Sequence, residues 1–310
     1  MILKYFGAEV KPYLSYTVAS VSGTVLAVCS CTILPLFQGI YKKGAGIGPA
    51  TAFLYSGPAI NILAIVYTAR LLGPELGAAR AVAAISLSVV IGAFMALIFR
   101  KEEKEKKTEV KKKRAIADGD GRSGKVTLLF FASMIAILVI GTAPLELWIR
   151  LSVIILLILA VSGLLIYYFT RDEVTDWGYE TWDLAKKILP ILLAGAFLVG
   201  VIAYFLPPEA FRPYIGGNSL VSCFVAAVVG ALLYMPTLLE VPIVGTSLGY
   251  SQGVIGGGPA LALLLAGPAI SLPSMLVLYR MIGEQKTAAY IALVVMTSTI
   301  AGYAYGLMGG

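Results

Sequence analysis

Two cysteines separated by a single residue are the first side chains in this sequence that could do chemistry. Cys29 and Cys31 belong to the run Cys-Ser-Cys-Thr-Ile-Leu-Pro, which ends at Pro35. In a regular helix, residues two apart point about 200° away from each other, so both thiols could not face one ligand. A helix loosened before Pro35 would bring them together, and two neighbouring thiols are soft ligands for a thiophilic metal or metalloid. The alternative is that both cysteines are small apolar core residues.

A single carboxylate interrupts an apolar run in the second half of the chain. Glu240 follows two leucines and comes two residues before Pro242. A carboxylate inside a bilayer costs several kcal/mol unless it is paired or protonated, which makes it a functional candidate. Glu240 is therefore predicted to carry a proton during a transport cycle. The alternative is an interfacial carboxylate at a helix end, because the helix boundary near Pro242 is uncertain.

The chain contains an internal repeat. The stretch 48–60 returns 210 residues later as 258–270, with nine of thirteen positions identical. The same offset matches four further pairs of residues: Arg70 with Arg280, Gly73 with Gly283, Ser88 with Ser298, and Gly92 with Gly302. The sequence therefore consists of two related halves.

Each half carries a Gly-Pro pair inside an apolar segment, Gly57-Pro58 in the first and Gly267-Pro268 in the second. Proline lacks an N–H and clashes with the preceding turn, so it frees a backbone carbonyl. Such a break survives in a membrane where it is buried in protein or lines a polar cavity. Paired breaks of this kind indicate a transporter's binding site. A plain structural kink is the alternative for each break.

Polar residues follow both breaks at equivalent positions. Asn61 and Ser271 come about one turn after the two prolines. Together with the Gly-Pro pairs they are predicted to line a substrate site between the halves. Each could instead hydrogen-bond to a neighbouring helix, a role that stabilises a membrane protein by about 1 kcal/mol.

Composition places the chain in a membrane. It is 59% hydrophobic and 13% charged, where a soluble domain is about 25% charged. Apolar runs reach the roughly 20 residues that a helix needs to cross a bilayer. We therefore predict an all-α, multi-pass protein of the cell membrane, with about eight to nine transmembrane helices in two structurally related repeats. The nine candidate segments are 13–37, 50–72, 81–99, 126–142, 147–170, 188–206, 219–241, 259–280 and 288–306.

One loop fixes the predicted topology. Residues 100–125 hold eleven Lys/Arg against six Asp/Glu, and positively charged loops remain cytoplasmic. The predicted organisation has four parts: a first transmembrane repeat over 1–99, the basic cytoplasmic loop over 100–125, a connecting transmembrane hairpin and surface segment over 126–187, and a second transmembrane repeat over 188–310.

The relative orientation of the two halves has two readings. Six crossings between their starts favour parallel halves, which we take as the prediction. The loop 243–258 has no Lys or Arg, whereas its counterpart in the first half has Lys42 and Lys43. Inverted halves explain that asymmetry better, and they would require one of the nine segments to be a re-entrant hairpin.

Several function classes are disfavoured by what the sequence lacks. Without any histidine, there is no imidazole base and no His-bearing zinc site. The three cysteines all fall in apolar stretches, so they form no secreted disulfide framework. The basic charge sits mostly in one loop, which gives no face for nucleic acid. We expect no enzyme activity, no metal and no cofactor; the expected partners are a small-molecule solute and the lipid bilayer, and a homo-oligomer is compatible with the sequence.

These motifs together resemble a known family. The pattern Cys29-Ser-Cys31-x-x-x-Pro, a short Lys- and Gly-containing loop, and Ala-x-x-x-x-Gly-Pro-Ala-x-Asn look like the ArsP/YraQ-type predicted permeases over nearly the whole chain. The resemblance implies export of trivalent organoarsenicals, with Cys29 and Cys31 as the thiol candidates and Gly57, Pro58 and Asn61 as the signature. The chain departs from the family in lacking an extra helix before the first repeat. Its second half also has no cysteine in the equivalent motif.

The predicted function is a secondary-type permease for a small soft or thiophilic solute, such as a trivalent organoarsenical or a metalloid. Its site would lie between the two Gly-Pro breaks, with Glu240 coupling transport to protons. The alternative is a membrane thiol oxidoreductase that uses Cys29 and Cys31. Neither a Cys-x-x-Cys spacing nor a second redox pair supports that alternative.

Overall fold

The computed structural model describes residues 16, 19–20, 30–42, 45–100, 102, 129, 133, 136–137, 140, 147–168, 170–205, 213–233 and 239–309. Within these ranges the chain forms eleven α-helices and no strand. Three of these helices are long and apolar enough to cross a membrane, or five spans if each of two bent helix pairs counts as one. The all-α class is therefore confirmed, and the helices support a multi-pass membrane protein.

The contacts divide the chain into two units, one of residues 112–187 and the other of residues 2–111 and 188–310. The first unit contains α9 (Leu147–Tyr168) and the beginning of α10 (Arg171–Phe205). The span 151–168 of α9 is apolar along its whole length, and most of its large side chains are exposed, as expected of a lipid-facing helix. The internal repeat lies in the second unit.

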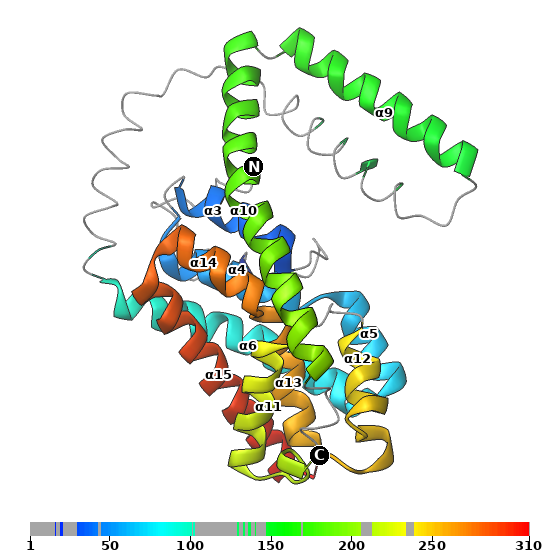
Figure 1. The fold of residues 1–310 in the computed structure, drawn as a ribbon, viewed down its shortest axis with the longest axis vertical. Helices are drawn as coiled ribbons and strands as arrows, with labels where there is room; N and C mark the ends of the chain where they lie inside the picture. Colours follow the sequence, from blue (N-terminus) through cyan, green and yellow to red (C-terminus); the bar gives the residue numbers. More distant parts are fainter. Residues whose placement is uncertain are drawn as a thin grey trace. The chain divides into compact units, whose positions relative to one another are not determined.

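Two short buried helices form the centre of the second unit (Figure 1). They are α4 (Ile47–Ala59) and α13 (Gly257–Ala269), each of 13 residues and buried along nearly all its length. At a rise of about 1.5 Å per residue each spans only about 20 Å, less than the roughly 30 Å of a bilayer core. A second helix continues each path after a bend, α5 (Ile62–Leu71) at 42° and α14 (Leu272–Ile282) at 48°.

The other helices of this unit pack around that centre. α4 packs against α3 (Ser30–Lys42) and α6 (Pro74–Ile98), while α13 packs against α11 (Leu220–Leu232) and α15 (Glu284–Leu307). α4 and α13 also contact each other, as do α6 and α15. Segments that are equivalent in the repeat thus form equivalent helices and meet along the middle of the unit.

Glycine pairs hold the long helix of each half against the short one. A Cβ atom built on Gly48 would stand 2.8 Å from the carbonyl oxygen of Gly92, and one on Gly92 would stand 2.7 Å from that of Gly48. Gly258 and Gly302 repeat this relationship at 2.8 and 2.5 Å. No residue with a side chain fits at such separations, because small residues are what allow membrane helices to approach this closely.

The turns that lead into the long helices are matched as well. Gly73 before α6 has φ 110°, and Gly283 before α15 has φ 85°. These positive values favour glycine, which has no Cβ to clash with the backbone. Because 210 residues separate the two glycines, the sequence repeat preserves this turn in both halves.

The two long helices run in opposite directions. Lys286, in the first turn of α15, forms an ion pair of 2.6 Å with Glu102 and lies over the ring of Phe99, both just beyond the end of α6. At the other end, Tyr305 near the end of α15 lies within electrostatic reach of Glu75 in the first turn of α6. The parallel arrangement predicted from loop counting is therefore wrong for this pair, because helices at equivalent positions of the repeat are antiparallel.

The described residues between α11 and α13, 233 and 239–256, do not form one regular helix. α11 ends at Leu232, and Leu233 has an extended backbone, so the predicted segment 219–241 is not one continuous helix. After it come α12 (Glu240–Pro242), a π-helical turn over Ile243–Ser247, and a 3₁₀ turn over Tyr250–Gln252. π-helical turns are rare and often occur at functional sites.

Candidate functional site

Glu240 is completely buried, and its partner is an equally buried arginine of α6, Arg80. Arg80 Nη2 donates to Glu240 Oε2 at 3.3 Å, and Arg80 Nη1 donates to Thr68 Oγ1 of α5 at 2.9 Å. The pair thus links α12 to α5 and α6. Glu240 is the first residue of α12 and is covered by protein on all sides.

Glu240 also lies against the second Gly-Pro break. A Cβ atom at Gly267 would stand 2.7 Å from Glu240 Oε1, closer than real Cβ contacts allow. On the same side, a Cβ atom at Gly230 of α11 would stand 3.2 Å from the Gly267 nitrogen. Gly230 therefore allows α11 to approach the break closely, and Gly267 makes room for the carboxylate.

The ion pair is incompletely satisfied. Within the described part of the chain, Arg80 Nε and Glu240 Oε1 are buried and have no hydrogen-bond partner. Removing an ion from water costs several kcal/mol, and attraction to a partner repays this only when the remaining donors and acceptors are also paired. A pair with an unpaired atom on each side contributes little to stability, which favours a functional reason for its presence.

Further buried polar side chains extend from Arg80 toward α15. Tyr55 of α4 lies within electrostatic reach of Arg80 and of Tyr290 on α15, and its hydroxyl faces that of Ser298. The two hydroxyls lie near each other without the geometry of a hydrogen bond. Among the described residues, the hydroxyls of Tyr55, Tyr290 and Ser298 are all buried without a partner. We call six residues the buried cluster: Tyr55, Thr68, Arg80, Glu240, Tyr290 and Ser298.

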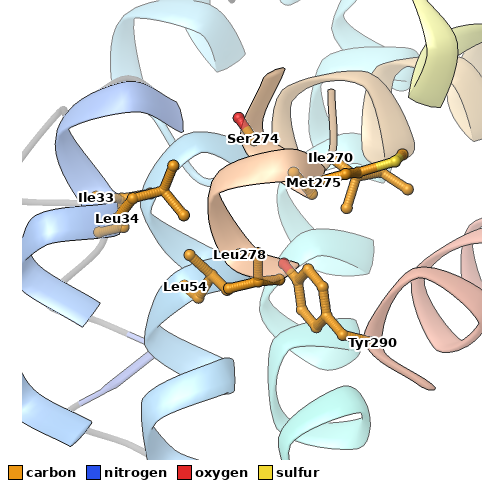
Figure 2. Close-up of a pocket in the computed structure, with 9 residues that line it drawn as sticks. Ile33, Leu34, Leu54, Ile270, Ser274, Met275, Leu278 and Tyr290 are labelled. Carbon is orange, nitrogen blue, oxygen red and sulfur yellow. The ribbon is translucent and has the colours of Figure 1, made fainter. Parts of the chain in front are cut away.

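A small cavity adjoins the buried cluster at Tyr290 (Figure 2). Its lining comes from α3, α4, the second break, α14 and α15, and consists of Ile33, Leu34, Leu54, Ala269, Ile270, Ser274, Met275, Leu278 and Tyr290. Most of this surface is apolar, with two hydroxyls and one thioether. Leu54 comes one turn before Pro58, and Ala269 directly follows Pro268. Both broken helices therefore contribute residues to the lining of the cavity.

Asn61 and Ser271 lie at their breaks as helix caps. The Asn61 side chain accepts a hydrogen bond of 3.0 Å from the Leu63 backbone N–H, which caps α5. Ser271 precedes α14, and its hydroxyl lies 2.8 Å from that of Ser274. Both side chains are buried, and neither lines the cavity, although Ser274 does.

The Gly-Pro pairs lie inside helices. Gly57 and Pro58 are buried near the end of α4, and Pro268 is buried at the same position in α13. Both helices end one residue after the proline, so each bend falls at the next two residues, 60–61 and 270–271. These positions match between the halves, as the sequence predicts.

The cysteines are described only in part. Cys29 lies outside the described residues, and Cys31 belongs to the first turn of α3. Ile33 and Leu34, which follow Cys31 closely in the chain, line the cavity. Cys223 is completely buried in α11, with its sulfur 3.1 Å from the Cβ position of Gly258. That environment agrees with a packing role for Cys223.

Arg80 and Tyr290 are members of the site that sequence reasoning missed. The predicted third segment began at residue 81, which left Arg80 outside it as a flanking charge. Two signals could have identified them: Arg80 is the one charge between Glu75 and Arg100 in a long apolar run, and it is 210 residues from Tyr290. The repeat therefore places both at the same position of the two long helices.

Comparisons with known proteins give relatives that match most of the chain. The chain is 44% identical to the UPF0718 protein MJ0584 of Methanocaldococcus jannaschii, over 99% of this chain and 86% of that protein. It is 25% identical to the UPF0718 protein YraQ of Escherichia coli K12, over 89% of this chain and 63% of that protein. No solved structure matches the chain. A family model described as a predicted permease matches residues 1–307, so the chain belongs to the ArsP_1 family of predicted permeases.

Proposed function

We propose that this chain is a secondary-type permease whose solute pathway passes through the buried cluster and the adjoining cavity. The observation that carries the proposal is the buried, incompletely satisfied pair of Arg80 and Glu240 beside the second break. Ionisable residues kept inside a membrane protein mark solute or ion pathways by default. Membership of a predicted permease family indicates a transporter rather than an enzyme, which argues against a thiol oxidoreductase.

The proposed architecture is a pair of inverted repeats with about eight to nine membrane-crossing helices. Matched bends, matched glycine pairs and the antiparallel α6 and α15 support it. Inverted repeats with broken helices place the solute site at the repeat interface near the bilayer midplane. The repeats would occupy residues 1–99 and 188–310, joined by the basic cytoplasmic loop 100–125 and the connecting region 126–187.

The proposed solute is small and soft or thiophilic. Cys31 belongs to the same turn of α3 as two lining residues of the cavity, and Met275 adds a thioether to the lining. Thiols and thioethers prefer soft partners. A trivalent organoarsenical or a metalloid would satisfy that preference, with Cys29 and Cys31 as the proposed thiol ligands.

Glu240 is the proposed proton-coupling residue. It is buried at the second break, and one of its two oxygens is unpaired among the described residues. A carboxylate in this position can take up a proton while the Arg80 contact is broken and release it when the contact forms again. The energy for transport would then come from a proton gradient.

Transport in lipid vesicles tests the proposal. Purified protein in vesicles should move at least one of arsenite, methylarsenite, antimonite or thiosulfate, and an imposed proton gradient should change the rate. Cys29→Ser and Cys31→Ser should abolish that transport, while Cys223→Ser, a buried packing cysteine, serves as the matched control and should retain it.

Two results would count against the proposal. Full activity of the Cys29/Cys31 double variant would show that the two thiols do not bind the solute, which rules out a thiophilic solute. If the wild type transports none of these solutes, with or without a gradient, the proposal of a permease for soft solutes is wrong.

A further inference from the structure

We propose that Arg80 binds the negatively charged group of the solute, which replaces Glu240 on the guanidinium. The inference rests on the proposed permease function and deepens it by naming the charge of the solute. In this arrangement one small anion and one proton enter the site together. Of the soft solutes proposed above, the transported form is therefore a small monovalent anion and not an uncharged arsenical such as methylarsenite, and it is co-transported with a proton.

Glu240 occupies only part of the Arg80 guanidinium. The guanidinium presents five N–H donors in a planar fork that matches the two oxygens of a carboxylate or oxyanion. Here Glu240 makes one contact of 3.3 Å, Thr68 takes one of 2.9 Å, and Nε has no acceptor within the described part of the chain. Strong charged pairs of this type are bidentate, at about 2.7–2.9 Å. An anion with two oxygens could therefore bind Arg80 better than Glu240 does.

The contact of Glu240 with Arg80 can also be broken easily. Its second oxygen lies over Gly267 with no hydrogen-bond donor among the described residues. A proton from solvent added to either oxygen converts the carboxylate into a neutral acid, which no longer needs a cation. The remaining N–H groups of Arg80 then become free for another anion.

Charge balance couples these two events. With Arg80 protonated and Glu240 ionised, the buried site has a net charge of zero. An anion that arrived without a proton would leave one negative charge in excess, and a proton that arrived alone would leave one positive charge in excess. Uncompensated charge is costly in a poorly solvated site. Binding of the anion and protonation of Glu240 therefore favour each other, and the loaded site is neutral again.

The neighbouring groups supply no competing charge. Arg80 and Glu240 are faced by Thr68 from α5, by Tyr55 from α4, and by the backbone of Gly267 from α13. Tyr290 on α15 lies beyond Tyr55. Phenols are uncharged between pH 5 and 8, and the π-helical turn after α12 contains no ionisable residue. Among the described residues of the site, Glu240 is therefore the group whose charge can respond in this pH range.

Three hydroxyls complete a path to the guanidinium. Those of Tyr55, Tyr290 and Ser298 are buried and have no hydrogen-bond partner among the residues that the structure describes, and Tyr290 also lines the cavity. Each can donate a hydrogen bond to an anion. An anion that enters the cavity would thus meet donors before it reaches Arg80.

Calorimetric titration of the purified protein in detergent tests the inference. The anionic probes are methanesulfinate and acetate, both monovalent with two oxygens on one atom, and the uncharged probe is methylarsenite. Titrations in two buffers of different ionisation enthalpy give the number of protons bound with each probe. For the wild type we expect about one proton per anion, and an affinity that rises up to about tenfold for each pH unit of acidification.

Two variants separate the roles of the pair. Glu240→Gln should still bind the anions, with no proton uptake and no pH dependence. Arg80→Gln alone leaves Glu240 buried without a cation and can prevent folding, so the double variant Arg80→Gln/Glu240→Gln is the neutral control. The double variant should fold, because two amides can pair with each other, and should lose anion binding at least 100-fold.

Three results would overturn the inference: no binding of either anion by the wild type between pH 5 and 8, unchanged anion binding in the double variant, or unchanged proton uptake in Glu240→Gln. Transport assays in vesicles distinguish failure of the proposed anion site from failure of the proposed permease function. If methylarsenite is transported and the double variant transports it equally well, the permease proposal stands and the anion site fails. If anions bind as expected but no solute crosses the vesicle membrane, the permease proposal fails alone.

Discussion

Arg80 on α6 and Tyr290 on α15 are 210 residues apart, the offset of the internal repeat, and both side chains are completely buried. The duplication therefore brings two different chemistries to one structural position. Arg80 carries a charge and pairs with Glu240, whereas Tyr290 offers a hydroxyl to the cavity. The two halves supply similar scaffolds and unequal functional groups.

Gly267→Ala should impair transport directly at the site. The new methyl group would stand 2.7 Å from Glu240 Oε1, so the carboxylate would have to move and its contact with Arg80 would be lost or distorted. We expect transport to fall at least tenfold in vesicles. Gly163→Ala in α9 is the matched control, since a Cβ atom there meets nothing within 4 Å. Equal transport by both variants would contradict the placement of Glu240 against the break.

Gly302→Ala should destabilise the second half. Its Cβ atom would stand 2.5 Å from the Gly258 carbonyl oxygen, and a backbone atom cannot move aside as a side chain can. Overpacking of this kind costs about 1–3 kcal/mol, so the thermal midpoint in detergent should fall. Gly39→Ala in α3 has open space around its Cβ position and should melt like the wild type. A midpoint that does not change in Gly302→Ala would mean that α13 and α15 are further apart.

Cross-linking checks the direction of the two long helices. In a protein without its natural cysteines, Glu102→Cys and Lys286→Cys should react with a short bismaleimide, because their native side chains form an ion pair. The pair Glu75→Cys and Lys286→Cys is the control, since α6 has 25 residues and its two ends are about 37 Å apart. Parallel halves would reverse the outcome, with a cross-link in the control pair.

The ion pair should show strong coupling in a stability cycle. Removing one partner of a buried pair destabilises a protein by about 3–5 kcal/mol, because it leaves the other charge uncompensated. Arg80→Gln and Glu240→Gln should therefore each lower the unfolding midpoint in detergent more than the double variant does. Independent, additive effects of the two substitutions would indicate that the side chains do not interact.

The two prolines should matter for transport more than for stability. Pro58→Ala and Pro268→Ala restore a backbone N–H and remove a ring clash, which should reduce the bends of 42° and 48° after α4 and α13. We expect transport to be lost while the thermal midpoint stays the same or rises. Pro190→Ala in α10 is a control, because Pro190 is exposed and lies outside the repeat motif. Normal transport by both variants would make the bends irrelevant to function.

Features that depend on local sequence could be predicted. Pro58 and Pro268 mark helix ends through their missing N–H, and Gly73 and Gly283 mark turns that need positive φ. The 210-residue offset between matching residues indicates the duplication without any information on packing. Burial of Glu240 is consistent with its position in an apolar run.

Features that depend on long-range packing could not be predicted. Arg80 and Glu240 are 160 residues apart, and no local pattern indicates which cation a buried carboxylate meets. The prediction that α6 and α15 are parallel was wrong for a related reason. Counting crossings treats every apolar run as one full span, whereas α11 ends at Leu232 and residues 243–252 form a π-helical and a 3₁₀ turn.

The contacts of Gly48 with Gly92 and of Gly258 with Gly302 bear on how such a protein can move. At each contact the backbones of two glycines approach closely, and at the first contact the Tyr16 side chain packs beside them and donates a hydrogen bond to the Gly92 carbonyl oxygen. Each short helix and its long neighbour should therefore behave as one rigid body. Alternating access would then come from rocking of one glycine-locked pair against the other, with the Arg80–Glu240 contact breaking and reforming as the irregular segment after Glu240 acts as the hinge.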